Sequence, residues 1–197
     1  MRKSLLFVWA CMGLVCLMSA CKTSVKSKEW KLVWVEDFDQ KNSFDESVWT
    51  KIPRGTSDWN NYMSYYDSCY AMQDGNLILR GIANHTQKND TAPYLTGGVY
   101  TKGKKLFTGG RVEVCARLQA AKGAWPAIWM LPEKAEWPKG GEIDIMERLN
   151  HDRIAYQTTH SYYTHILGIK DNPPHGGINK INPEEYNIYS VDIYPDS

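Results

Sequence analysis

The sequence has little excess charge of either sign: 23 Lys and Arg face 22 Asp and Glu, which leaves a formal net charge of +1. This balance gives no electrostatic reason to expect nucleic acid or a membrane surface as a partner. The chain also lacks an internal repeat, a low-complexity tract and a convincing amphipathic helix, which argues against a helical or repetitive architecture. Its 197 residues, 43% of them hydrophobic, are enough for one globular domain with a substantial core.

No hydrophobic run is long enough for an ordinary membrane span of about 20 residues. The run from Leu5 to Met18 has a basic start and a small-residue end, as in an export signal. Cys21 follows "LMSA" and resembles the bacterial lipobox, in which this cysteine carries lipid; a plain secretory signal is the alternative. We therefore expect a lipoprotein signal peptide at 1–20, a polar tether at 21–29 and lipid attachment at Cys21. The protein would then be exported to the cell envelope or outer-membrane surface and meet the membrane only through its lipid.

Cysteine is scarce once the signal is set aside. Cys11 and Cys16 leave with the signal and Cys21 would carry lipid, so Cys69 and Cys115 remain in the domain. A disulfide is allowed in an oxidising compartment, and two separate buried thiols are the alternative, because the sequence does not give their Cα separation. Nothing in the sequence supports a metal-binding or nucleophilic role for either thiol.

Short strand-like runs follow one another, separated by Gly, Pro, Asn and Asp. The run at 111–118 alternates between hydrophobic and polar residues with a period of two, and "QDGNL" at 73–77 is typical of a turn that leads into a strand. The strands expected are 31–38, 76–82, 111–118, 127–131, 142–147, 153–160 and 186–194. The predicted class is all-β and sandwich-like.

Aromatic residues are plentiful, with eight Trp and twelve Tyr. Flat amphipathic rings suit the faces of sugars, although they also serve as core. Two long segments, 50–70 with Trp59 and Asn61, and 161–185 with His165, are predicted as loops that carry aromatic, amide and imidazole side chains. Such loops on a β scaffold usually bind something; the alternative is a surface loop that packs on itself.

Three carboxylates, Glu142, Asp144 and Glu147, lie close together in "GGEIDIMERLN" among hydrophobic residues. Carboxylates that share a site repel one another, and one of them is usually forced to keep its proton. On a regular strand Glu147 would point away from the other two. A β-bulge at Ile145-Met146 would turn all three acids to one side and leave the opposite side hydrophobic.

Two carboxylates that flank a glycosidic bond can hydrolyse it with retention, because one attacks the anomeric carbon and the other protonates the leaving oxygen. A third carboxylate between them can hydrogen-bond the nucleophile and adjust both pKa values. A divalent-cation site is a rival interpretation, although one strand offers few of the ligands that calcium takes. A solvated acidic edge strand fits poorly with the interleaved Ile143, Ile145 and Met146.

The motif "GEIDIME" after "GAWPAIWMLPE" resembles glycoside hydrolase family 16, the laminarinase, lichenase and agarase group, in its bulged E-x-D-x-x-E form. Weaker similarities lie at 32–38, 97–118, 158–160 and 185–196. The resemblance implies a concanavalin A-like β-jelly-roll with a concave cleft, formed by a catalytic domain at 30–197. It also implies several further strands after the last residue, so we expect the domain to be incomplete at its C-terminus.

Carried over by position, the resemblance makes Glu142 the nucleophile, Asp144 its hydrogen-bonding assistant and Glu147 the general acid/base. It places a histidine near the acid/base, and a donor to a sugar hydroxyl in the first long loop. The substrate-binding candidates are Trp59, Asn61, Trp125, Trp129, Trp137 and His160, of which Trp129 could equally belong to the core.

The sequence departs from laminarinase-like members at "NNYMSYY", where Tyr62 and Ser64 replace an acid and an amide, and at Ile193, where Trp is common. We therefore expect endo-acting, retaining hydrolysis of internal β-glycosidic bonds in a β-1,3-glucan, or in a β-galactan or host O-glycan. The alternatives are a catalytically inactive glycan-binding surface lipoprotein and a calcium-dependent structural module. We expect a monomer with a polysaccharide partner, no nucleic acid partner, no required cofactor and no metal in the site; a structural calcium ion elsewhere on the fold is compatible with this.

Overall fold

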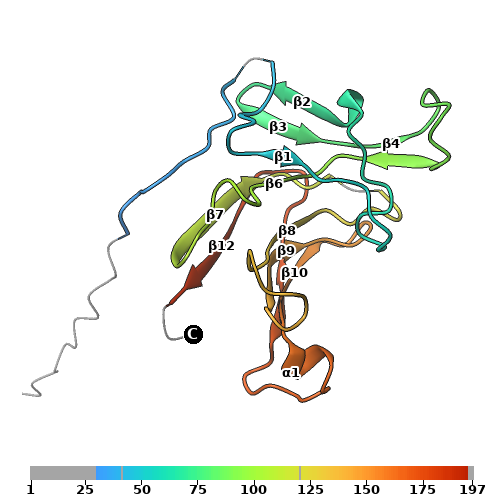
Figure 1. Cartoon of the computed structure of the whole chain (residues 1–197). Coiled ribbons are helices and arrows are strands. Elements are labelled where there is room, and N and C mark those ends of the chain that lie inside the picture. Colours follow the sequence, from blue (N-terminus) through green and yellow to red (C-terminus); the bar gives the residue numbers. More distant parts are fainter. Residues whose placement is uncertain (1–29, 41, 120, 195–197) are drawn as a thin grey trace, which may run out of the picture. The chain divides into compact units, whose positions relative to one another are not determined.

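A computed structural model describes residues 30–40, 42–119 and 121–194 of the chain (Figure 1). The predicted signal peptide, most of the tether and the lipid-bearing Cys21 lie outside these residues. Nearly all the regular structure of the compact unit that begins at Leu32 consists of antiparallel strands, so the prediction of an all-β class is confirmed. Among the described residues no helix is long and apolar enough to cross a membrane.

The predicted site lies on a four-stranded antiparallel sheet with the order β11-β10-β9-β8. Its strands are β8 (Ala127–Met130), β9 (Glu142–Glu147), β10 (Ile154–His160) and β11 (Gly176–Lys180). Figure 1 shows β10 running into a short helix, α1 (Tyr162–His165), before the chain returns as β11. The predictions for β8, β9 and β10 are confirmed to within a residue at each end.

A second pair of strands packs over the inner face of this sheet. β7 (Gly110–Ala116) pairs antiparallel with β12 (Asn187–Ile193), and alternate residues of β7 are half-buried and exposed, as the period of two predicts. The buried side chains between the two layers come from β9, β10, β12 and the segment after β7: Leu118, Ile145, Met146, Ala155 and Tyr189. The arrangement is a sandwich with one shared core.

The remaining strands form short antiparallel pairs. They are β1 (Thr50–Lys51) with β6 (Val99–Tyr100), β2 (Tyr70–Gln73) with β3 (Asn76–Leu79), and β4 (Gly81–Ala83) with β5 (Tyr94–Thr96). The turn predicted at 73–77 is confirmed: Asp74 and Gly75 connect β2 to β3 with φ of 52° and 69°, the pair of positive values that a tight hairpin requires.

Two predicted strands are wrong. Residues 31–38 form no strand: Trp34, Glu36 and Phe38 do alternate inward, and all three contact Trp49, but no backbone ladder forms with any described strand. The expected strand 76–82 is divided between β3 and β4. At Arg80 the backbone changes partner, donating to the Cys69 carbonyl and accepting from the Gly97 amide, so the ladder passes from one hairpin to the next.

The loop predictions are partly wrong as well. Segment 161–185 contains α1 and β11, and segment 50–70 contains β1 and a 3-10 turn, η1 (Asp67–Cys69). Every residue of β11 is exposed, so its sequence has no hydrophobic alternation to reveal it. Of the cysteine alternatives, the separate thiols hold, with Cys69 buried but Cys115 exposed.

Candidate active site

β9 carries the bulge that the sequence predicts. Between its paired positions 144 and 147 lie two residues, Ile145 and Met146, whereas the matching stretch of β10 contains Gln157 alone. The register against β8 also shifts by one residue at Ile145. The side-chain amide of Gln157 donates a hydrogen bond to the Ile145 carbonyl oxygen at 3.1 Å, so a side chain of β10 bridges the point where the ladder is interrupted.

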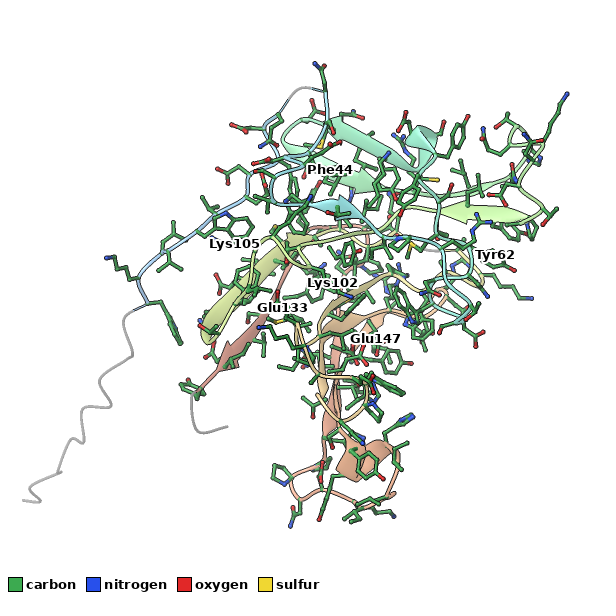
Figure 2. The ribbon with its side chains drawn as sticks, in the orientation of Figure 1. Phe44, Tyr62, Lys102, Lys105, Glu133 and Glu147 are labelled. Carbon is green, nitrogen blue, oxygen red and sulfur yellow. The ribbon has the colours of Figure 1, made fainter. Side chains whose placement is uncertain are left out.

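The bulge sends hydrophobic and acidic side chains of β9 to opposite sides. Ile145 and Met146 are 2% and 0% exposed and lie in the core. Glu142, Asp144 and Glu147 lie outside that cluster, and Asp144 is close enough to both glutamates for their charges to raise its pKa. Figure 2 shows Glu147 over the strands of the four-stranded sheet, well away from the α1 end. The three carboxylates therefore share one side of the sheet, as predicted.

Each glutamate is held by the indole of a predicted substrate-binding tryptophan. Trp137 Nε1 donates to Glu142 Oε2 at 2.7 Å, and Trp125 Nε1 donates to Glu147 Oε1 at 2.7 Å. Both tryptophans are nearly half exposed, so part of each ring stays open to a ligand. A hydrogen bond of this length orients the carboxyl group through one oxygen and leaves the second oxygen free of this contact.

Asp144 is the buried member of the set, with its side chain 5% exposed. Burial raises the pKa of this carboxyl to about 7, and the neighbouring charges of Glu147 and Glu142 add to the effect. His160, the last residue of β10, places its Nε2 at 3.1 Å from Asp144 Oδ2. With a pKa raised this far toward neutrality, Asp144 can keep its proton at a pH where an ordinary carboxyl is ionised, and in that form it can donate a hydrogen bond.

The remaining predicted residues divide between the site and its surroundings. Trp129 lies opposite Asp144 in the β8–β9 ladder, and the exposed ring of Trp59 packs on it edge-on at 5.4 Å, so the first long loop reaches this sheet. Asn61 Oδ1 is buried without a hydrogen-bond partner among the described residues. No described hydrogen bond joins Asn61 to the three carboxylates, so its predicted role stays a prediction.

His165 is a neighbour of the site that the sequence did not single out as a site residue. Its ring lies 4.5 Å from the Trp137 ring and 6.1 Å from the His160 ring. The signal that could have found it is the pair Ser161 and Thr164, which caps a short helix directly after β10.

The site is open rather than enclosed. A separate hollow of about 480 Å³ contains none of the predicted site residues; Gln119, Arg148, His151, Arg153, Pro183 and Glu184 line it. Within the described part of the chain, no group of His, Cys, Asp and Glu side chains has the arrangement of a metal site. An open surface with half-exposed indoles suits a polymer that lies across the sheet better than a small molecule held in a cavity.

An all-β sandwich whose bulged strand presents three carboxylates, two of them bonded to tryptophans, has the groups that glycoside hydrolysis uses. The chain belongs to glycoside hydrolase family 16, because the model of the XgeA-like catalytic GH16 domain matches residues 70–175. The family resemblance drawn from the carboxylate motif is thus confirmed.

Individual relatives agree with this assignment. The chain is 38% identical over 174 residues to a keratan-sulfate endo-1,4-beta-galactosidase of Sphingobacterium multivorum, a match that covers 86% of this chain and 40% of the relative. It is 31% identical over 193 residues to a beta-glucanase of Rhodothermus marinus, covering 92% of this chain and 65% of that one. The solved laminarinase of Rhodothermus marinus superposes with a TM-score of 0.72 at 30% identity, over 85% of this chain and 69% of that structure. This likeness confirms the predicted jelly-roll fold.

Proposed function

We propose that this domain hydrolyses internal β-glycosidic bonds of a polysaccharide with retention of anomeric configuration. The observation that carries the proposal is the bulge of β9, which gathers Glu142, Asp144 and Glu147 on one side while Trp137 and Trp125 each hold one glutamate at 2.7 Å. The family membership and the endo-acting relatives support it.

In the first step Glu142 attacks the anomeric carbon while Glu147 gives its proton to the departing oxygen, so the glycosidic bond breaks as the bond to Glu142 forms. In the second step Glu147, now a carboxylate, takes a proton from water, and the resulting oxygen displaces Glu142 from the anomeric carbon. Asp144, whose raised pKa lets it keep a proton, can donate a hydrogen bond to Glu142 as the negative charge of Glu142 returns.

The substrate class that we favour is a β-galactan or a galactose-containing host glycan, with β-1,3-glucan second. Two observations support this order. The relative that acts on keratan sulfate shares 38% identity with the chain, and the beta-glucanase shares 31%. Tyr62 and Ser64 also stand where laminarinase-like members carry an acid and an amide.

The test is product analysis after incubation with keratan sulfate, mucin-type O-glycans, agarose, porphyran, carrageenan, β-1,3-glucan and mixed-linkage glucan. New reducing ends on internal cleavage of one polymer are expected from the wild type, and none from Glu142→Ala. Azide should restore bond cleavage to Glu142→Ala and give a glycosyl azide of inverted configuration, because azide attacks the anomeric carbon in place of the missing nucleophile and is not displaced.

The rival function, glycan binding without catalysis, predicts saccharide binding but no new reducing ends from any polymer in this panel. Glu142→Ala is the matched control for that outcome. If the wild type and the variant bind equally and release nothing, the rival function replaces the proposed one.

We also propose that the protein is exported as a lipoprotein, since the sequence around Cys21 carries the lipobox pattern. Labelling of cells with a palmitate analogue should mark the wild type and not Cys21→Ser. Equal labelling of both would contradict the anchor.

A monomer is expected by size-exclusion chromatography with light scattering, and no cofactor should be needed for turnover after exhaustive dialysis against a chelator.

A further inference from the structure

α1 begins where the active-site strand β10 ends. His160, the last residue of β10, pairs with Glu142 in the ladder. The next residue, Ser161, caps the helix: its side chain accepts from the Thr164 amide at 3.2 Å, and the Thr164 hydroxyl accepts from the Ser161 amide at 3.2 Å. This reciprocal cap holds the single turn of helix in a fixed position on the end of the strand.

One face of this helical turn contacts the segment before β9. The His165 ring meets the Trp137 ring at 4.5 Å and 63°, an edge-on arrangement. Tyr162, three residues earlier and therefore on the same face, lies 6.0 Å from the Lys139 ammonium group. The two contacts, one helical turn apart, dock α1 on the chain that carries Trp137.

His165 thereby lies between the two groups that contact the acids. On one side is Trp137, which donates to Glu142, and on the other is His160, whose ring lies 6.1 Å away at 85° and which contacts Asp144. We propose that His165 is a positioning residue for this reaction: it holds the Trp137 indole in the orientation that keeps Glu142 aimed at the substrate. This inference rests on the proposed function for its catalytic consequence, but not for the contact itself.

The physical reason is the exposure of Trp137. Trp137 is 47% exposed, so few neighbouring side chains restrict the rotation of its indole. The edge-on contact with His165 is therefore a large part of what holds the indole in one orientation. If the indole turns, Glu142 loses the hydrogen bond at 2.7 Å. Misplacement of a reacting group by about 1 Å can lower the rate by about 10²-fold.

The experiment that tests the contact follows the indole N–H signals of the chain labelled with ¹⁵N-tryptophan. Trp137→Phe identifies the Trp137 signal. His165→Ala should speed the exchange of this proton with solvent by about tenfold or more, since its hydrogen bond opens more often. His165→Phe, which keeps an aromatic edge, should exchange nearly as the wild type does, and so should Tyr163→Ala, an exposed position of the same helix.

The catalytic consequence is read on the polysaccharide that the wild type cleaves. His165→Ala should lower kcat by about 10- to 100-fold with KM changed by less than about threefold, and His165→Phe should recover most of it. Unchanged exchange in His165→Ala would overturn the inference, and so would faster exchange with unchanged kcat. If the wild type cleaves no polymer, the proposed function is overturned. Faster exchange of the Trp137 N–H in His165→Ala would in that case still support the positioning of Trp137.

Discussion

The raised pKa of Asp144 makes a prediction about stability that does not depend on any substrate. The carboxyl is 5% exposed, and burial first, then Glu147 and Glu142, raise its pKa from 3.8 to about 7. In the unfolded chain it ionises near 3.8. Between these two values the folded protein keeps a proton that the unfolded chain has released, so folding becomes less favourable as the pH rises.

The size of the effect follows from the two pKa values. A shift of one pKa unit corresponds to about 1.36 kcal/mol. The shift of the Asp144 pKa from 3.8 to about 7 therefore corresponds to on the order of 4 kcal/mol of unfolding free energy. This stability is present below about pH 4, is lost between about pH 4 and pH 7, and stays lost above that. The figure is an upper value for Asp144 alone, because three neighbouring carboxylates share the titration.

Asp144→Asn keeps the shape of the side chain and cannot ionise. The unfolding free energy of the variant should equal that of the wild type near pH 4 and exceed it by on the order of 2–4 kcal/mol at pH 8. The variant should also lose most hydrolytic activity. Urea unfolding followed by tryptophan fluorescence at a series of pH values measures the difference. Glu185→Gln, an exposed carboxylate on the turn before β12, is the control and should show no such trend. A difference in unfolding free energy between Asp144→Asn and the wild type that is constant with pH, or that grows toward acid pH, would refute the reasoning.

Three further outcomes follow from the geometry of β9 and of the segment before it. Glu147→Gln should slow substrates with poor leaving groups by about 10²–10⁴-fold and activated aryl glycosides far less; equal losses would show that Glu147 is not the acid. Deleting Ile145 should turn Glu147 toward the core and lower both activity and melting temperature more than Ile145→Ala does, and a deletion variant that remains active would contradict the role of the bulge. In Gly140→Ala the new Cβ would collide with Pro132 Cγ and lie 2.6 Å from Ala135 Cβ, so we expect about 1–3 kcal/mol of destabilisation by urea unfolding. Gly103→Ala is the control: no atom outside its chain neighbours lies within 4 Å of the new Cβ, so it loses stability only through the strain of its own backbone at a φ of 71°.

The parts of the fold that the sequence could predict are strands with one face packed on the core and the other face exposed to water. β7 alternates because one of its faces packs on the core and the other meets water. The bulge in β9 could be predicted because a regular strand would have put Glu147 in the core and Met146 among the acids. In both cases the constraint is local, so a short window of sequence contains it.

The parts that could not be predicted depend on partners far along the chain. Residues 31–38 have the alternation of a strand, yet their inward side chains meet Trp49 and their backbone finds no described ladder. β11 has the opposite character: its five residues are exposed and patternless, and the ladder with β10 alone makes it a strand. The sequence marks His165 only as part of a long loop, because its contact is with Trp137, 28 residues earlier, and not with its own neighbours in sequence.

The bulge joins the stability of this domain to its chemistry. The residues that it turns inward, Ile145 and Met146, are among the most deeply buried side chains of the core, and the same kink sets Asp144 beside two other acids in a poorly hydrated position. An uncharged amide at position 144 would remove the cost of ionising a buried acid and preserve the fold. A protein that only bound glycans would therefore gain stability at neutral pH from that single replacement and would lose nothing in the contacts of its exposed tryptophans. A hydrolase that follows the proposed mechanism would lose the carboxyl group that can donate a hydrogen bond to Glu142. The proposed hydrolysis therefore gives a use to a buried acid beside Glu142 and Glu147, which glycan binding alone does not require.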